Sequence, residues 1–197
     1  ILPDPIGDPM FDRWPKNLDK REPGDVLATR DVTAKTGFLV TVPIRRATMV
    51  KFRSTDTHDV PIFGTATIIE PREAWKGREP RPILVNNVPI NGLGTECTAG
   101  YTLTNGYSDK TNQTDLFPPT TQLALSKGYA VIVPDHEGPR QAYAEPTLAG
   151  HVVLDSVRAA AKFSPKKYGD GRVAVTGYSG GAIATNGTAK VIDAYAP

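Results

Sequence analysis

Alternating apolar and polar positions in the first third of the chain predict β-strands. Residues 47–54 alternate between two faces, with Val50 and Phe52 on the apolar one. Further β-rich runs cover residues 38–42 and 60–69. Because only a short polar turn separates residues 47–54 from the run that follows, we expect an antiparallel hairpin at the edge of a larger sheet.

Later in the chain, short apolar runs alternate with segments of helical character. The runs have the length of buried strands and occupy residues 83–88, 129–134 and 172–176. The helical segments occupy residues 120–127, 147–163 and 182–196. This alternation predicts an α/β fold in which a mostly parallel central sheet follows antiparallel N-terminal strands and carries helices on both faces.

The first residues differ in character from the rest of the chain. Residues 1–24 are rich in proline and aspartate and show no periodicity, so we expect an extended arm that Phe11 and Trp14 anchor to the surface. Residues 25–197 would then form part of a single domain, beginning with a short strand-like run at residues 26–30.

The segment Gly177-Tyr-Ser-Gly-Gly181 lies between the last apolar run and the last helical segment. A G-x-S-x-G sequence between a strand and a helix is typical of the nucleophile elbow of serine hydrolases, which makes Ser179 a candidate nucleophile. The glycines would allow close approach of strand and helix, and the Gly180 N–H would face a developing oxyanion. A glycine-rich turn with a chance serine is the structural alternative.

A serine nucleophile needs a base and an acid that orients the base. In α/β-hydrolases both follow the serine along the chain, but the residues after Ser179 include Asp193 and no histidine. Asp193 lies more than three turns along the predicted helix, so its side chain should point away from Ser179. His136 directly follows a predicted strand, so a non-standard triad in which His136 is the base is an alternative. We expect instead that the base and the acid lie beyond Pro197 or on a second chain.

Composition narrows the classes of function. A net charge of +2 gives no nucleic-acid footprint, and no apolar run reaches the length of a membrane span. The chain starts at Ile1 rather than methionine, which suggests trimming and is compatible with a removed export signal. Cys97 is the only cysteine, and an odd cysteine in a secreted protein suggests a partner outside the chain.

A series of short segments resembles the secretory lipase family (Candida antarctica lipase A-like α/β-hydrolases), especially its actinobacterial members. The segments keep the family order along nearly the whole chain, but the resemblance covers only the first half of the family sequence. The helical lid and the part with the catalytic acid and histidine have no counterpart here. The matching segments are residues 23–26, 52–56, 64–71, 91–97, 128–138, 153–160, 177–181 and 195–197.

The resemblance implies roles for individual residues. Ser179 would be the nucleophile, and the Gly180 N–H would be one oxyanion donor. Asn91 stands where family members carry aspartate or glutamine as the other oxyanion residue. Cys97 matches a family cysteine that forms a disulfide with the missing half, which fits an exported protein. The motif at residues 135–138 lies near the family's pocket, and we interpret it as structural.

We therefore expect a secreted carboxylic ester hydrolase, similar to lipases and esterases, that works through an acyl-enzyme. No metal or cofactor is implied. The expected partners are a lipid or other acyl ester, the remaining C-terminal portion of the protein and, transiently, a lipid interface. An acyltransferase or serine peptidase on the same fold and a non-catalytic binding module are the alternatives. The chain alone should be inactive and aggregation-prone, because its sheet edge would be exposed.

Overall fold

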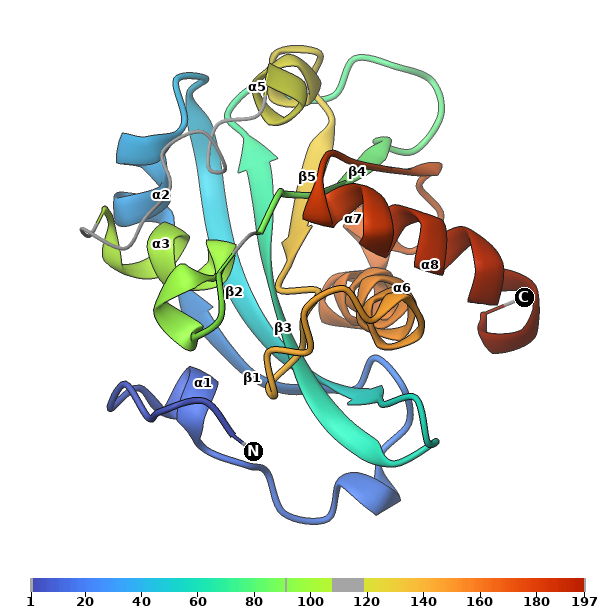
Figure 1. Cartoon of the computed structure of the whole chain (residues 1–197). Helices are drawn as coiled ribbons and strands as arrows, with labels where there is room; N and C mark the ends of the chain where they lie inside the picture. Colours follow the sequence, from blue (N-terminus) through green and yellow to red (C-terminus); the bar gives the residue numbers. More distant parts are fainter. Residues whose placement is uncertain (1, 91, 108–118, 197) are drawn as a thin grey trace.

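A six-stranded mixed sheet forms the centre of the protein in our computed structural model, with the strand order β1-β2-β3-β5-β4-β6 (Figure 1). The structure describes residues 2–90, 92–107 and 119–196. The strands are β1 (Val26–Asp31), β2 (Ile44–Thr55), β3 (Pro61–Pro71), β4 (Ile83–Asn87), β5 (Ala130–Pro134) and β6 (Val173–Gly177).

The sheet has an antiparallel and a parallel part. The pairs β1–β2, β2–β3 and β3–β5 are antiparallel, whereas β4 pairs in parallel with both β5 and β6. The carboxyl ends of the three parallel strands therefore meet at one end of the sheet, where Asn87, Pro134 and Gly177 lie. This end of the sheet places the candidate site.

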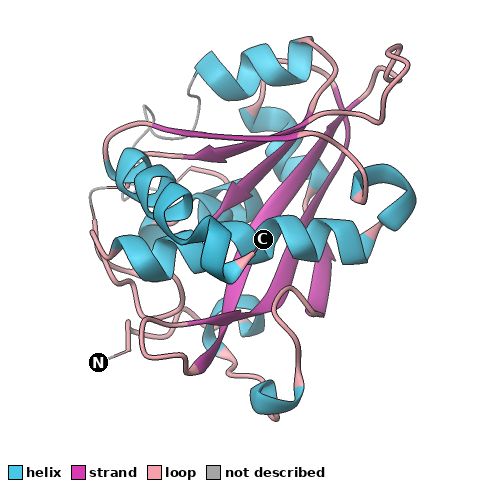
Figure 2. Ribbon diagram, turned by 90° about the vertical axis from the view of Figure 1, so that its right-hand side faces the viewer, coloured by secondary structure: helices cyan, strands magenta, loops and turns pink. Residues whose placement is uncertain are grey.

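Helices cover both sides of the twisted sheet (Figure 2). One side packs against α6 and α8, and the other side packs against α2, α3 and α5. The helices are α1 (Pro9–Asp12), α2 (Thr33–Leu39), α3 (Ala99–Asn105), α5 (Pro119–Ser126), α6 (Pro146–Phe163), α7 (Pro165–Tyr168) and α8 (Gly180–Tyr195), with short 3-10 turns η1 (Leu18–Lys20) and η2 (Thr95–Cys97). None of the helices in the described ranges is long and apolar enough to span a bilayer.

The long helix α6 illustrates how local sequence sets an element. Pro146 occupies its first turn, where a missing N–H costs nothing, and the Glu145 carboxylate accepts hydrogen bonds from the Thr147 and Leu148 N–H groups. Its apolar face includes Val152 and Val153, which are fully buried against the sheet. The predicted helix at residues 147–163 is thus confirmed.

Two predictions about the N-terminal strands were wrong. Residues 38–42 do not form a strand, because α2 covers Thr33–Leu39 and buries Thr36 and Leu39, three positions apart on one helical face. The hairpin of β2 and β3 lies inside the sheet rather than at its edge, because β1 pairs with β2 on the outside. The short run at residues 26–30 is therefore the edge strand on this side of the sheet.

Candidate active site

Ser179 sits in a strained turn between β6 and α8. Its backbone dihedrals are φ 54° and ψ −122°, a positive-φ conformation that non-glycine residues rarely adopt. The residue is exposed, and the neighbouring Tyr178 is 78% exposed. A serine held at unfavourable backbone angles and open to solvent matches the geometry of a nucleophile elbow.

The glycines of the turn allow helix α8 to press against the sheet. A Cβ on Gly181 would collide with the carbonyl oxygen of Asn87 in β4, and one on Gly177 would collide with the carbonyl oxygen of Gly181. A Cβ on Gly180 would lie 2.5 Å from the Ile90 carbonyl oxygen. Only glycine fits at these positions without a shift of backbone, so the spacing of the motif is a packing requirement.

The start of α8 offers N–H groups beside Ser179. The N–H of Gly181 bonds to the Tyr178 carbonyl and that of Ala182 bonds to the Ser179 carbonyl, both at 2.9 Å. The Gly180 N–H precedes them at the first position of the helix, where no earlier helical turn supplies an acceptor. Ile90 lies beside this position, whereas Asn91, the other predicted oxyanion residue, is outside the described residues.

Asn87 stabilises the turn at Ser179 through hydrogen bonds, a role that the sequence did not predict. It is fully buried at the end of β4, and its Nδ2 donates to Thr185 Oγ1 at 3.0 Å. The Thr185 hydroxyl in turn donates to the Gly181 carbonyl at 2.9 Å. The only signal in the sequence is a pair of asparagines closing an otherwise apolar run.

Asp135 links the end of β5 to neighbouring segments. Its carboxylate accepts a hydrogen bond from Thr65 Oγ1 at 2.6 Å and one from the Gly100 N–H at 2.7 Å. Burial raises the pKa of Asp135 to about 6, although both hydrogen bonds favour the charged form. Asp135 thereby fastens the start of α3 to the sheet at the end that carries Ser179.

None of the histidines contacts Ser179 in the part of the chain that the structure describes. The ring of His136 is buried and donates from Nε2 to the Val88 carbonyl at 3.1 Å, and burial lowers the pKa of His136. His151 bonds through Nδ1 to the Thr55 carbonyl at 3.2 Å, and His58 is exposed in the turn between β2 and β3. His136 thus holds the end of β4 and is not placed as a base for Ser179.

Glu137 is the least satisfied polar group near the turn. The residue is 2% exposed, and neither carboxylate oxygen has a hydrogen-bond partner within the described ranges. It lines a cavity of about 10 Å³ together with Gly180 and Ile183 of α8. Burial, with a smaller contribution from the charge of Asp135, raises the pKa of Glu137 to about 7.

Cys97 has no disulfide partner among the described residues. It is half-buried at the end of η2, and its Sγ lies 3.7 Å from the Leu93 carbonyl oxygen. The described residues also contain no group of three His, Cys, Asp or Glu side chains that could hold a metal ion.

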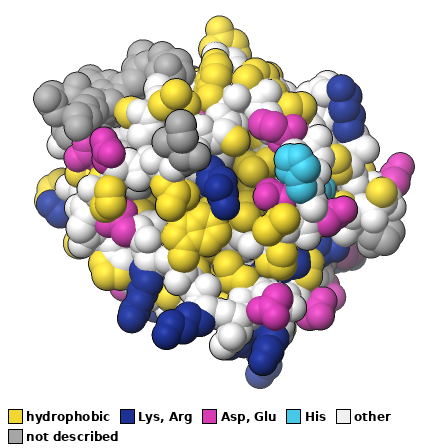
Figure 3. All heavy atoms as spheres, turned by 60° about the horizontal axis from the view of Figure 1, so that its bottom comes forward, with side chains coloured by type: hydrophobic (Ala, Val, Ile, Leu, Met, Phe, Trp, Pro, Cys, Tyr) yellow, Lys and Arg dark blue, Asp and Glu magenta, His cyan; other side chains and the backbone are white. Residues whose placement is uncertain are grey.

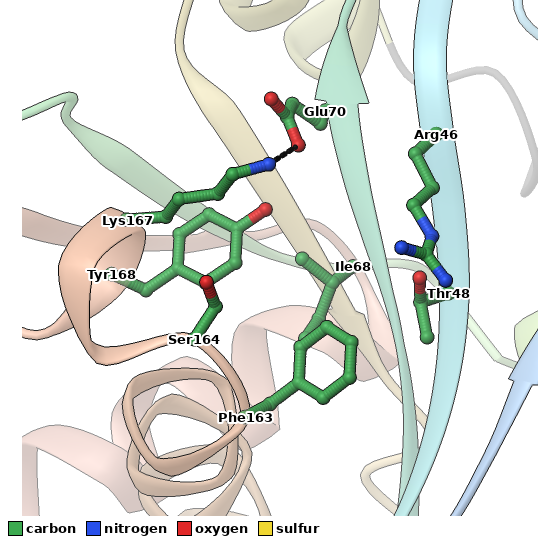
Figure 4. Close-up of a pocket in the computed structure, with 8 residues that line it drawn as sticks. All are labelled: Arg46, Thr48, Ile68, Glu70, Phe163, Ser164, Lys167 and Tyr168. Carbon is green, nitrogen blue, oxygen red and sulfur yellow. Dashed lines mark hydrogen bonds and ion pairs between the residues drawn. The ribbon is translucent and has the colours of Figure 1, made fainter.

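A separate pocket of about 230 Å³ lies at the opposite end of the sheet (Figure 4). Glu70 is the second-to-last residue of β3, and its neighbour Ile69 pairs with Val131 near the start of β5, so this pocket is remote from the carboxyl ends of the parallel strands. The Glu70 carboxylate pairs with Lys167 Nζ at 2.7 Å, and Phe163 and Ile68 form its apolar wall. It has no geometric relation to Ser179.

The chain is similar to known lipases and esterases. A sequence model of the secretory lipase family matches residues 108–197. A secreted triacylglycerol lipase of Malassezia furfur is 33% identical over 196 residues, which cover 96% of this chain and 38% of that protein. A protein of Mycobacterium tuberculosis named "probable inactive lipase" is 31% identical over 198 residues, covering 98% of this chain and 43% of that protein.

Solved structures confirm the predicted α/β-hydrolase fold. Candida antarctica lipase A in its closed state superposes with a TM-score of 0.82 and 28% identity, over 100% of this chain and 44% of that one. A rice cell wall degrading esterase from Xanthomonas oryzae shares the fold with a TM-score of 0.63 and 17% identity, over 89% of this chain and 47% of that one. The chain therefore spans less than half the length of these relatives.

Proposed function

Because this chain belongs to the secretory lipase family, we propose that it forms the nucleophile-bearing part of a secreted carboxylic ester hydrolase. The observation that carries the proposal is the backbone of Ser179, held at φ 54° between β6 and α8. A chance serine in a glycine-rich turn would not need this strained conformation. The names of secreted relatives support an exported protein that acts on lipid-like acyl esters.

In the proposed reaction, Ser179 Oγ attacks the ester carbonyl carbon and forms a tetrahedral intermediate. The alcohol leaves, the serine carries the acyl group, and water then releases the carboxylic acid and restores the hydroxyl. The Gly180 N–H at the start of α8 would stabilise the oxyanion, with Asn91 as the second donor. Both donors are proposals from the family pattern and the helix geometry.

The proton of Ser179 must pass to a base that the described residues do not supply. The rings of His136 and His151 form hydrogen bonds with backbone carbonyls, and His58 is exposed in the turn between β2 and β3. We therefore place the base and its orienting acid in a further part of the protein. Cys97 would form a disulfide with that part, which peptide mapping with and without reductant would detect as a Cys97-linked pair.

Replacing Ser179 by alanine in the whole protein tests the proposal. Hydrolysis of a triacylglycerol emulsion and of a soluble p-nitrophenyl ester should fall by roughly 10⁴-fold or more, since nucleophile removal in serine hydrolases has effects of this size. A fluorophosphonate should label the parent protein at Ser179 and leave the variant unlabelled. Ser126→Ala, which alters an exposed serine at the end of α5, is the matched control and should retain full activity.

Unchanged hydrolysis in the Ser179→Ala protein would refute this mechanism. A folded parent protein that neither hydrolyses esters nor takes up the fluorophosphonate would favour the non-catalytic reading, consistent with the name of the Mycobacterium tuberculosis relative. Product analysis in the presence of a competing alcohol separates hydrolysis from acyl transfer, because both pass through the same acyl-enzyme.

A further inference from the structure

A groove of about 620 Å³ lies between the N-terminal arm and the edge strand β1. One wall consists of arm residues around α1, and the other consists of consecutive residues of β1 from Leu27 to Arg30. Figure 3 looks toward the face of the molecule that carries the arm and shows apolar side chains gathered near its centre, with Lys and Arg among and around them. The groove includes neither Ser179 nor any residue at its turn.

The groove combines apolar walls with cationic side chains. Met10, Trp14 and Leu27 supply apolar surface, and Trp14 is fixed by an edge-to-face contact with Phe63 at a centroid distance of 5.1 Å. The cationic side chains that line it are Arg13, Lys16, Arg30 and Lys51. No aspartate or glutamate lines the groove within the described residues.

Two of these cations have no ion-pair partner in the described structure. Arg13 and Lys16 are exposed, and no carboxylate there lies within ion-pair distance of either. Arg30 differs, because its guanidinium binds both carboxylate oxygens of Asp8 at 2.6 and 2.7 Å. Arg13 and Lys16 are therefore free to bind an anion in the groove.

Lys51 adds a buried positive charge behind them. The residue is 3% exposed, and its ammonium donates to the carbonyls of Pro9 and Arg13 and lies 3.8 Å from the centre of the Phe63 ring. Burial lowers the pKa of Lys51 to about 8 against the smaller raising effects of the Asp12 and Asp8 charges, and the charge of Arg13 makes the smallest, lowering contribution. Because the hydrogen-bond partners of Lys51 are uncharged carbonyls, its ammonium contributes a positive potential that would attract an anion to the groove.

We propose that this groove is a binding site for a single-chain amphiphile with a carboxylate head, such as a medium- or long-chain fatty acid. The head group would bind Arg13 and Lys16, since a guanidinium can hold both oxygens of a carboxylate. The chain would lie on Met10, Trp14 and Leu27. The volume falls within the range of small-molecule sites, which combine apolar walls with a few placed polar groups.

Quenching of Trp14 fluorescence by 12-bromododecanoate, kept below its critical micelle concentration, tests the proposal in the whole protein. The bromine quenches nearby indoles, and the part of the signal lost in a Trp14→Phe variant reports the groove alone. This part should saturate, weaken with added NaCl and persist in Ser179→Ala. If the signal persists in Ser179→Ala, binding in the groove does not depend on the chemistry proposed for Ser179.

Matched variants test the role of charge. In Arg13→Gln/Lys16→Gln, the dissociation constant of the Trp14-dependent signal should rise at least ~10-fold, in line with the loss of charge-assisted hydrogen bonds. Lys20→Gln/Arg21→Gln removes the same charge from exposed arm positions outside the groove and should change it less than about twofold. Thermal unfolding of both double variants checks that the arm stays folded.

Several results would overturn the proposal. Equal affinity for 12-bromododecanol would reduce the groove to a nonselective apolar surface, and quenching that is unchanged in Trp14→Phe would place the ligand elsewhere. Tighter competition by dodecyl phosphate than by dodecanoate would assign the head group to a phosphate instead of a carboxylate. Absence of any saturable Trp14 signal would show that the groove binds no such amphiphile.

Discussion

A buried carboxyl group lies near each end of helix α8, and the two differ in their hydrogen bonding. Near the C-terminal end, Asp155 of α6 accepts hydrogen bonds from Ser54 Oγ, Tyr195 OH and Arg158 Nη1 at 2.8, 2.7 and 2.9 Å. Near the N-terminal end, Glu137 has no partner for either oxygen among the described residues. Burial raises the pKa of both groups.

The Asp155 network anchors the far end of the nucleophile helix. The Tyr195 hydroxyl oxygen also accepts a hydrogen bond from the Thr55 hydroxyl at 2.9 Å, and the Arg158 guanidinium donates to the Tyr195 carbonyl at 2.6 Å. The ring of His151 stacks on Tyr195 with a centroid distance of 3.9 Å. These contacts tie the C-terminal end of α8 to α6 and β2.

Close packing of glycines holds the rest of α8. A Cβ on Gly187 would collide with the Pro146 carbonyl of α6, and one on Gly150 would lie 2.8 Å from the Gly187 carbonyl carbon. Close packing and hydrogen bonds thus fix the middle and the C-terminal end of α8, and Gly181 packs equally closely against β4 at the N-terminal end. Beside Ser179, however, lie a strained residue and an acid that has no hydrogen-bond partner among the described residues, and such groups concentrate at functional sites.

The largest effect should come from filling the space under the turn. Gly181→Ala places a methyl group against the Asn87 carbonyl, so α8 must move away from β4 and displace Ser179. We expect kcat/KM for ester hydrolysis to fall by about 100-fold, since misplacement of reacting groups by about 1 Å can cost this much. Steady-state assays on the whole protein measure it.

Gly37→Ala is the matched control for that change. Gly37 lies within α2, and a Cβ there would have its nearest neighbour at 3.9 Å, an ordinary contact with Ile44. Activity should be unchanged and stability should rise by roughly 0.5 to 1 kcal/mol, because alanine favours helices. Equal kinetics for the Gly181 and Gly37 variants would show that the turn does not set the position of Ser179.

Breaking the anchor at the other end should destabilise the fold. Asp155→Ala leaves Arg158, Ser54 and the Tyr195 hydroxyl without their shared acceptor, so we expect a loss of about 3–5 kcal/mol in the free energy of unfolding. Urea titration measures it. Asp193→Ala, at an exposed position of α8, should cost less than about 0.5 kcal/mol.

A loss below about 1 kcal/mol in Asp155→Ala would contradict the anchor, because it would mean that the surrounding donors find water instead. A large loss in Asp193→Ala would show that α8 is sensitive to any change of charge. Either result would remove the contrast between the two ends of the helix.

Glu137 should make the free energy of unfolding depend on pH. The ordinary glutamate pKa of 4.5 applies to the unfolded chain, and burial raises the pKa of Glu137 to about 7 in the folded one. The folded state then binds the proton more tightly, so stability is fully present below pH 4.5 and falls as pH rises to about 7. The loss is about 3 kcal/mol, with a same-signed contribution from Asp135.

Glu137→Gln should flatten this dependence by roughly 3 kcal/mol, because an amide has no proton to lose. Glu73→Gln, at an exposed position, should keep the slope of the parent protein. Urea unfolding at several pH values between 4.5 and 8 measures both. A slope in Glu137→Gln equal to that of the parent would mean that the folded protein supplies Glu137 with a partner.

The parts of this molecule that sequence patterns predicted are those with local causes. The turn at Ser179 is local, because its glycines and serine lie within five consecutive positions between a strand and a helix. Helix α6 and strands β4 and β5 follow from periodicity and run length. The wrong strand prediction at residues 38–42 has a non-local cause. Tertiary packing of Thr36 and Leu39 favours helix α2 there, despite the β-rich side chains.

Long-range polar contacts left no readable pattern. Ser54 and Asp155 are 101 positions apart, and Asn87 and Thr185 are 98 apart, so neither pairing follows from spacing. The isolation of Glu137 is equally hidden, because a motif of charged residues does not reveal which side chain lacks a partner. Asp135, His136 and Glu137 are adjacent in sequence, yet among the described residues only the side chains of the first two form hydrogen bonds.

Ser54→Ala is the mildest test of the contrast between the ends of α8. It removes one of the three donors to Asp155 and leaves the bonds from Tyr195 and Arg158, so the carboxylate stays paired. We expect a loss of about 1 kcal/mol in urea unfolding, the typical net value of one hydrogen bond. A cost as large as that of Asp155→Ala would mean that the network acts as a single unit, and a cost near zero would mean that the remaining donors satisfy the acid. An intermediate value supports an anchor in which each bond adds to the hold on the nucleophile helix.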